Sequence, residues 1–190
     1  MQMRLNSDMA IIALGANLPV DQTAPQATLY SAMDTLDQKM TLLSRSLIYR
    51  TPAFPVNNGP DFANACVLVE TAFESDQLLQ VLHDIENAFG RVRAQRWGAR
   101  VLDLDLIAHG NRVTPDIATY NHWRLMDADA QMHQTPDQLI LPHPRVQDRA
   151  FVLGPLRDIA PDWQHPIIGR SVEQMWQDLP QTHSQAITSL

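Results

Sequence analysis

The stretch VLDLDLIAH (residues 101–109) alternates leucine with aspartate in its first half. Alternation with a period of two is the pattern of a β-strand that turns one face toward the core. We therefore predict a strand over 101–109 whose leucines enter the core. On its other face Asp103 and Asp105 are expected to project together, with about 6 to 7 Å between them.

Segments upstream of this strand carry the other patterns of a small mixed fold. Apolar runs predict three strands, at 10–14, 42–50 and 62–70. Apolar residues at helical spacing predict two helices, at 25–38 and 75–88. Three prolines and a glycine indicate a loop at 51–61. The order β-α-β-β-α-β predicts an α+β fold of the ferredoxin-like kind, an antiparallel sheet with helices on one face.

Downstream of the strand the patterns are weaker. Residues 114–138 are polar, bounded by proline and without clear periodicity, which favours an extended surface loop or flap. A short strand at 139–141 and helical stretches within 145–159 and at 171–179 are expected as extra C-terminal elements. The tail after Pro180 is expected to fray. The 190 residues are predicted to form a single domain, 1–190.

The composition narrows the class of protein and of ligand. Apolar residues make up 45% of the chain, which is typical of a folded protein, and no apolar run approaches the roughly 20 residues of a membrane helix. We expect no membrane association, no signal peptide and, with Cys66 as the single cysteine, a cytoplasmic setting. The net charge of −7 argues against a general nucleic-acid binder. Thirteen of the fourteen lysines and arginines are arginine, which favours a small anion as ligand.

The aspartate pair has two interpretations. Two carboxylates on one side of a rigid strand suit magnesium, which prefers oxygen ligands, or two ions about 3.5 to 4 Å apart in a phosphoryl-transfer site. A solvent-facing strand with two ordinary aspartates explains the alternation equally well, because polar residues commonly face outward in antiparallel sheets. The residues upstream shift the balance toward the metal-binding interpretation.

Four arginines precede the strand within ten positions, namely Arg91, Arg93, Arg96 and Arg100. A surface network of ion pairs would explain them, but they also match a triphosphate, whose oxygens are shared between metal ions and guanidinium forks. Trp97 beside a glycine suggests a loop that closes over a ligand. Because the chain has neither a G-x-x-x-x-G-K-[ST] nor a G-x-G-x-x-G motif, side chains and metal would hold the phosphates.

Two further clusters carry weaker signals. His143 stands between two prolines and is followed by Arg145 and Arg149, so it is either a structural hydrogen-bonder or a phosphate contact. Phe62 and Asn64 share one face of a predicted strand. They suit stacking on, and hydrogen bonding to, a flat ring that contains amide groups, although packing alone is the commoner reason for such a pair.

The segments YRTPAF, DFANA, IENAFGRVRAQRWGARVLDLDL and LPHPRVQDRAFVLGPLRDIAPDW follow one another along the chain. Together they resemble the motifs of the 6-hydroxymethyl-7,8-dihydropterin pyrophosphokinases of folate biosynthesis. The opening ALGANL is similar to the first strand of that family, and the match runs from Ala10 to about Trp163 apart from one segment. The combination R-W-G-x-R-x-L-D-L-D is far more specific than a lone pair of acids.

The resemblance implies a reaction between ATP and 6-hydroxymethyl-7,8-dihydropterin. The hydroxymethyl oxygen of the pterin attacks the β-phosphorus of ATP, AMP leaves, and the pterin gains a diphosphate. The family's metal site maps onto Asp103 and Asp105, which would bind two magnesium ions. Its catalytic phosphate contacts map onto Arg91 and Arg100, and Trp97 would lie on the closing loop.

The remaining roles implied by the resemblance divide between the two substrates. The nucleotide contacts would be Arg93, Leu106, His143 and Arg149. The pterin contacts would be the sandwiching rings of Phe62 and Phe151, the amide of Asn64, and the backbone around Thr51, Pro52 and Phe54. Glu86 matches a motif position to which the residues themselves assign no role.

Residues 114–138 depart from the resemblance, because the family joins these strands with a much shorter segment. A flap near the nucleotide or an oligomer contact is favoured for this insert over metal binding by His122 and His133. We expect a monomer or weak homodimer that binds neither nucleic acid nor membrane. The alternative functions are a non-catalytic, ferredoxin-like regulatory module that binds nucleotide or pterin and, less favoured in an acidic chain, a nucleic-acid-binding module.

Overall fold

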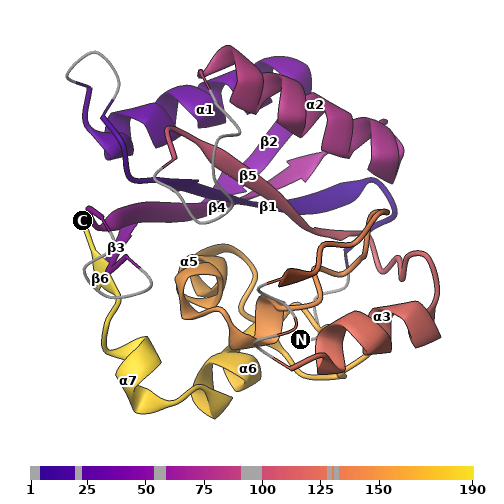
Figure 1. The fold of residues 1–190 in the computed structure, drawn as a ribbon. Coiled ribbons are helices and arrows are strands. Elements are labelled where there is room, and N and C mark those ends of the chain that lie inside the picture. The colour runs from indigo at the N-terminus through magenta and orange to yellow at the C-terminus, as the bar shows by residue number, and fades with distance from the viewer. Residues whose placement is uncertain (1–4, 20–22, 54–58, 91–99, 128–129, 131–132) are drawn as a thin grey trace.

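The structure is a computed structural model of the chain. It describes residues 5–19, 23–53, 59–90, 100–127, 130 and 133–190. The elements, labelled as in Figure 1, are β1 (Met9–Ala16), α1 (Pro25–Lys39), β2 (Thr41–Arg45), β3 (Tyr49–Thr51), β4 (Phe62–Glu70), α2 (Ser75–Ala88), β5 (Asp103–His109), α3 (Ile117–Leu125), the short 3-10 helix η1 (Val146–Asp148), α5 (Ala150–Ile159), α6 (Val172–Asp178), α7 (Gln181–Ser184) and β6 (Thr188–Ser189).

One six-stranded antiparallel sheet forms the centre of the molecule. Its strands run in the order β5-β1-β4-β3-β6, while β2 pairs with β4 further along the edge that β3 uses. The central pair, β1 and β4, stays in register along its whole length, from Met9 opposite Glu70 to Ala16 opposite Ala63. This arrangement confirms the predicted α+β class with an antiparallel sheet.

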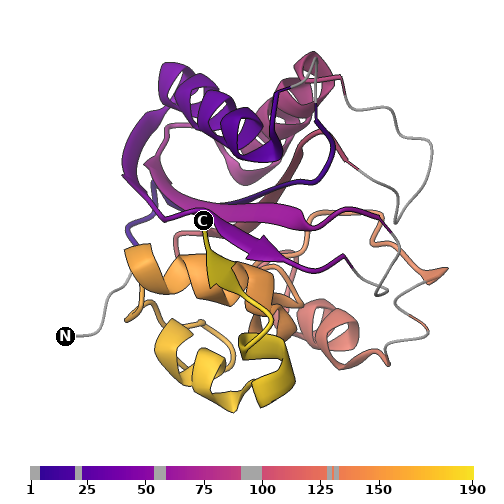
Figure 2. The same cartoon turned by 90° about the vertical axis from the view of Figure 1, so that its left-hand side faces the viewer.

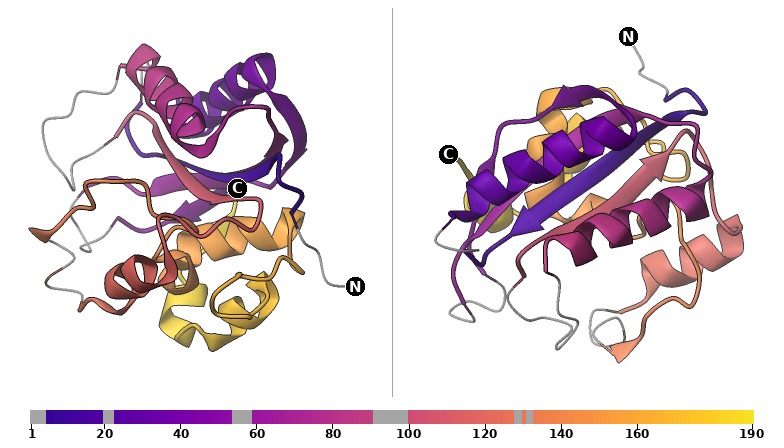
Figure 3. Two further views of the ribbon diagram at one scale, coloured as in Figure 1. Left: turned by 90° about the vertical axis from the view of Figure 1, so that its right-hand side faces the viewer. Right: turned by 90° about the horizontal axis from the view of Figure 1, so that it is seen from above.

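Helices cover both faces of the sheet (Figures 1 and 2). On one face α1 and α2 bury the alternate strand residues that include Ile12, Leu14 and Leu104. On the other face α5 and α6 pack against the intervening residues, such as Ile11 and Cys66. The prediction of helices on one face therefore holds for the β-α-β-β-α-β part, and the C-terminal elements add the second layer (Figure 3).

The boundaries of α2 follow from its flanking residues. Glu74 is its N-cap, in place of the predicted Ser75 or Asp76, and the backbone N–H of Glu74 donates to the side-chain oxygen of Gln77 at 3.0 Å. The helix stops as predicted before Gly90, whose φ of 85° is a left-handed conformation that glycine adopts without a Cβ clash. This cap and this stop set the helix against β5.

The predicted strand at 42–50 is wrong as one unit, because it is two strands. β2 and β3 both pair with β4, but the three residues between them leave the ladder. Ser46 occupies the gap, where its hydroxyl accepts the backbone N–H of Cys66 at 2.9 Å. Ile48 is buried in the same core that Leu42 packs against, so the alternation of buried and exposed side chains continues although the ladder is interrupted. A side chain that substitutes for a backbone partner breaks a strand without leaving a polar group unsatisfied.

The prediction of an extended loop over 114–138 is corrected by α3. Asp116 caps this helix by accepting the N–H of Thr119 at 2.9 Å. Tyr120 is fully buried, and its hydroxyl lies 2.7 Å from Nε2 of His165. Tyr120 is also the one buried residue of the helix, which explains why the sequence shows no apolar periodicity there. The strand expected at 139–141 is reduced to one bridge between Thr114 and Leu141.

The tail after Pro180 does not fray as predicted. It forms α7 and then β6, in which Thr188 and Ser189 pair with β3. The backbone N–H of Leu190 donates to the carbonyl of Ile48 at 2.8 Å and extends this pairing to the last residue. None of the described helices combines the length and the apolarity needed to cross a bilayer.

Candidate active site

Three strands bring polar residues into one row on the face that α5 covers in part. Gly15 of β1 pairs with Asp103 of β5 on one side and with Asn64 of β4 on the other. Two strand spacings of about 4.8 Å place the Cα atoms of Asp103 and Asn64 roughly 10 Å apart. A Cβ at Gly15 would lie 3.3 Å from Oδ1 of Asn64, so glycine keeps the middle of this row open. Thus the carboxylate pair and the Asn64 amide border one open floor.

The two aspartates lie as the alternation predicts. The leucines beside them are buried in the core under α1 and α2, so both carboxylates stand on the opposite face. Asp103 pairs with Arg100, and Oδ2 of Asp105 lies 3.2 Å from Nη1 of Arg149. Their side chains keep 22% and 37% of their exposure and are open to a ligand.

The donor set of this pair fits magnesium. No third His, Cys, Asp or Glu gathers with them among the described residues. Magnesium in nucleotide sites is ordinarily held by one or two carboxylates together with substrate phosphates and water. Two carboxylates on a strand that the core fixes are therefore a sufficient contribution from the protein.

Arg100 is fixed by Asn17, which follows the end of β1. The backbone N–H of Arg100 donates to Oδ1 of Asn17 at 2.7 Å, and its carbonyl accepts the N–H groups of Asn17 and Leu18 at 3.0 and 3.1 Å. Nδ2 of Asn17 donates to the carbonyl of Pro60 at 3.2 Å. Asn17 is 2% exposed, so this buried amide joins three segments that border the row.

His143 is held in one orientation beside β5. Its backbone N–H donates to the carbonyl of Ile107 on β5 at 2.7 Å, and its Nδ1 accepts the N–H of Arg145 at 3.1 Å. Burial lowers the pKa of His143 well below its ordinary value, and the guanidinium of Arg149 adds to this. The ring is therefore neutral at pH 7, with its proton on Nε2, and offers one N–H donor.

Three of the predicted pterin contacts, Thr51, Phe62 and Asn64, lie together at the Asn64 end of the row. Nδ2 of Asn64 donates to Oγ1 of Thr51 at 2.8 Å, and both residues are buried. Phe62 begins β4 on the same face and is half-buried, while Phe151 on α5 is 40% exposed. The guanidinium of Arg149 lies 5.6 Å from the centroid of the Phe151 ring. Arg149 thus contacts both a predicted metal ligand and a predicted ring-stacking residue.

Other predicted residues are placed differently or fall outside the described part. The side chain of Leu106 is 4% exposed in the core on the far side of β5, so only its backbone is available to a nucleotide. Pro52 is exposed directly after β3. Four residues with predicted roles lie outside the described residues, namely Phe54, Arg91, Arg93 and Trp97.

Sequence reasoning missed two residues of this site, Gly15 and Asn17, and it assigned no role to Glu86. Gly15 and Asn17 both stand in ALGANL, the segment that resembles the first strand of the family. A glycine in a buried strand signals a close approach by another group, and a buried asparagine signals a backbone clamp. The glycine is visible in the sequence, but the burial of Asn17 and the partners at Asn64, Arg100 and Pro60 depend on the fold.

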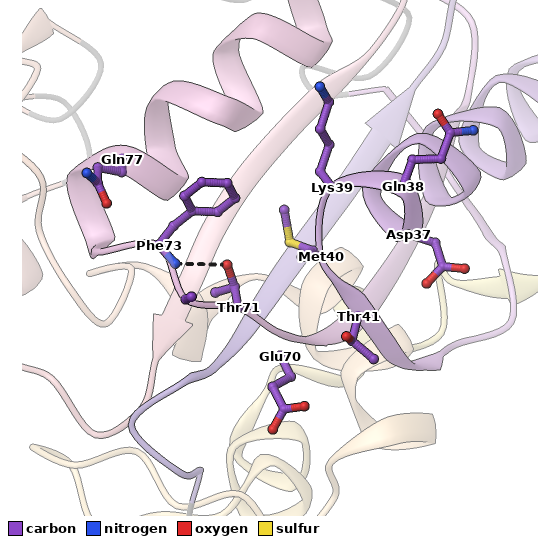
Figure 4. Close-up of a pocket in the computed structure, with 10 residues that line it drawn as sticks. Asp37, Gln38, Lys39, Met40, Thr41, Glu70, Thr71, Phe73 and Gln77 are labelled. Atoms are coloured by element: carbon purple, nitrogen blue, oxygen red, sulfur yellow. Dashed lines mark hydrogen bonds between the residues drawn. The ribbon is translucent and has the colours of Figure 1, made fainter.

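An open depression of about 730 Å³ lies at the opposite end of the sheet (Figure 4). Lys39 and Thr41 at the junction of α1 and β2, and Glu70 and Phe73 between β4 and α2, are among the residues that line it. Glu70 is six residues beyond Asn64 along β4, roughly 20 Å away in an extended strand. None of the residues predicted for catalysis or binding lines this depression, so it is separate from the row.

Comparison with known proteins matches residues 11–161 to the family described as 7,8-dihydro-6-hydroxymethylpterin-pyrophosphokinase (HPPK). A Synechocystis protein named 2-amino-4-hydroxy-6-hydroxymethyldihydropteridine pyrophosphokinase is 40% identical over 127 residues, which are 67% of this chain and 54% of that protein. A Haemophilus influenzae protein of the same name is 34% identical over 157 residues, 80% of this chain and 82% of that protein. The chain thus spans about half the length of the first relative and most of the second.

The fold also has solved counterparts. The crystal structure of Plasmodium falciparum HPPK-DHPS superposes with a TM-score of 0.59 at 15% sequence identity. The superposition covers 89% of this chain and 43% of that one. At this level of identity the likeness supports the fold, and the sequence relatives support the family.

Proposed function

Because the chain belongs to the 7,8-dihydro-6-hydroxymethylpterin-pyrophosphokinase family, we propose that it transfers diphosphate from ATP to 6-hydroxymethyl-7,8-dihydropterin and releases AMP. The observation that carries the proposal is the row of Asp103, Gly15 and Asn64 on one face of the sheet. Asp103, at the end proposed for phosphate and metal, and Asn64, at the end proposed for the pterin ring, lie roughly 10 Å apart with Gly15 between them. That separation suits a pterin whose hydroxymethyl arm points toward a bound triphosphate.

The bond changes require positioning more than covalent chemistry from the protein. The pterin hydroxymethyl oxygen forms a bond to the β-phosphorus, the bond from that phosphorus to the oxygen bridging to the α-phosphate breaks, and the hydroxyl proton is released. AMP departs with the bridging oxygen. Such transfers depend on holding the attacking and leaving oxygens in line and on neutralising the phosphate charge.

The phosphate end is supplied by β5 and the residues beside it. Asp103 and Asp105 would hold two magnesium ions, which shield phosphate oxygens and polarise the β-phosphorus when bound. Arg100 and Arg149 place guanidinium groups at the same carboxylates and are positioned to take phosphate oxygens. The neutral ring of His143 adds an N–H donor without adding a charge.

The pterin end is supplied by β3, β4 and α5. Asn64 is fixed by Thr51 and presents an amide to the floor of the site, where it would pair with the amide-like edge of the pterin. The rings of Phe62 and Phe151 would stack on the two faces of the bicycle. A site that hydrogen-bonds a substrate edge rejects analogues that lack the matching groups, because the buried Asn64 and Thr51 would be left unpaired.

The reaction is tested by incubating the purified chain with ATP, magnesium and 6-hydroxymethyl-7,8-dihydropterin. We expect one AMP for each diphosphorylated pterin. Asp103→Ala and Asp105→Ala should each abolish AMP formation while circular dichroism shows an intact fold. Asp76→Asn removes an exposed carboxylate at the start of α2 and should leave the rate unchanged. ATP binding without AMP release in the wild type would instead favour a regulatory, non-catalytic module.

A further inference from the structure

We propose that Glu86 of α2 is a positioning residue that fixes β5 between the two aspartates. Oε1 of Glu86 accepts the backbone N–H of Leu104 at 2.8 Å. Leu104 is the residue that separates Asp103 from Asp105. The Glu86 side chain, on α2, is therefore bonded to β5 at the backbone position midway between the two aspartates. This position is 18 residues beyond Glu86 along the chain.

The need for this bond follows from the place of β5 in the sheet. β5 is the first strand in the order β5-β1-β4-β3-β6, and no described strand pairs with its outer edge. Leu104 stands opposite Leu14 of β1, yet its N–H points to Glu86 and not into the ladder. An edge strand whose N–H groups lack partners exchanges between pairings more easily than a central one. Glu86 supplies the partner that a further strand would have supplied.

Because Glu86 is buried, its hydrogen bond to Leu104 is poorly explained as an incidental contact. The residue is 0% exposed, and it lies next to the core positions Leu82 and Ile85 on α2. A carboxyl group is costly to bury unless it is hydrogen-bonded, and an apolar residue would fill the same space without that cost. The Leu104 N–H, however, would then lose its acceptor. A buried acceptor at this position is therefore explained by the Leu104 N–H that it holds.

The consequence for the site concerns the geometry of the metal ligands. The carboxylates of Asp103 and Asp105 keep their spacing and direction only if the strand keeps its pleat at Leu104. Removing a residue that orients metal ligands without binding the metal itself typically lowers metal affinity by about 10- to 100-fold. This step rests on the proposed function, since it takes the aspartates to be the magnesium ligands.

The test compares Glu86→Met, which removes the acceptor at similar volume, with Glu86→Gln, whose amide oxygen still accepts. Asp84→Asn is the matched control, because Asp84 is an exposed acid two residues before Glu86 on the same helix. Two readouts are needed beside activity. One is amide hydrogen exchange at Leu104 in the free protein, and the other is magnesium binding by calorimetry in the presence of a non-hydrolysable ATP analogue.

For E86M we expect exchange at Leu104 to accelerate at least about tenfold and magnesium affinity to fall about 10- to 100-fold. E86Q should stay within about threefold of the wild type in both, and D84N should match it. A folded E86M with wild-type magnesium affinity overturns the proposal. So does an E86Q as weak as E86M, because the acceptor would then not be what matters.

If E86M fails to fold, Glu86→Asp replaces it, since it retracts the carboxylate by one methylene. An E86D variant that keeps wild-type magnesium affinity then overturns the proposal. The proposed reaction fails separately. A wild type that forms no AMP, but whose magnesium affinity and Leu104 exchange respond to Glu86 as stated, refutes the reaction and leaves the positioning role.

Discussion

Asn17→Ala removes a buried amide that ties the end of β1 to the residue Arg100 before β5. In the wild type Oδ1 of Asn17 accepts from Arg100 and Nδ2 donates to the carbonyl of Pro60. Alanine makes neither bond and leaves the Arg100 N–H without its acceptor. The perturbation is therefore local and has both a stability and a catalytic consequence.

The stability change follows from the two lost bonds. Each net hydrogen bond contributes about 1 kcal/mol, and a polar group left unpaired near the protein interior adds a similar amount. We expect the free energy of unfolding to fall by about 2 to 3 kcal/mol. For a chain of this length that corresponds to a melting temperature lower by about 5 to 10 °C.

The catalytic change follows from Arg100. If the backbone of Arg100 moves by about 1 Å, we expect its guanidinium to lose its contacts with the phosphate oxygens. A misplacement of that size costs on the order of 100-fold in rate. The assay is AMP release at saturating substrates, well below the melting temperature. The expected result is a large fall in kcat.

The control is Asn111→Ala, whose amide also donates to a backbone carbonyl, that of Leu5, at 3.3 Å. Asn111 follows the far end of β5, so this variant should lose about 1 kcal/mol of stability and no activity. A kcat for N17A within about threefold of the N111A value would refute the reasoning, whatever the loss of stability.

Two other predictions concern the stacking ring and the dependence of stability on pH. Phe151→Leu removes one face of the expected sandwich, so the KM for pterin should rise about 3- to 10-fold, with a smaller change for ATP in steady-state assays. An unchanged pterin KM would show that the ring does not stack. Burial lowers the pKa of His165 to about 4, so the unfolded chain takes up a proton near pH 6.5 that the folded chain refuses. Stability from this group is therefore complete above about pH 6.5 and declines by about 3 kcal/mol as the pH falls toward 4. Urea titrations at pH 7 and 4.5 should show this decline in the wild type and a smaller one in His165→Gln.

The elements predicted with success are those whose own side chains record their environment. β4 and β5 alternate or run apolar because each contributes side chains to the apolar cores on the two faces of the sheet. α2 shows an apolar stripe because one of its faces is buried. The elements missed are those held by single distant partners. α3 depends on Tyr120 meeting His165, and β6 depends on pairing with β3. Local sequence does not carry such contacts.

The candidate site divides in the same way. Alternation was enough to place Asp103 and Asp105 on one face, and the resemblance named Asn64 and Phe151 as candidates for the pterin site. The row itself was not predictable, because it requires the register that sets Gly15 opposite both Asp103 and Asn64. Register depends on three strands at once, and a shift by one residue would turn each of these side chains to the other face.

The two ion pairs on β5 bear on how this site takes a nucleotide. Asp103 contacts Arg100 and Asp105 contacts Arg149, so each carboxylate of a closely spaced pair already has an opposite charge beside it. This arrangement offsets the repulsion between two neighbouring carboxylates on one strand. In the proposed function, a magnesium nucleotide would bring cations for the acids and oxyanions for the guanidiniums. Each side chain would then exchange one partner for another of the same sign, and no charge would be left unpaired as water is displaced. On this proposal the acids and arginines of the motif act as one unit, in which each arginine pairs with an acid until the substrate binds both.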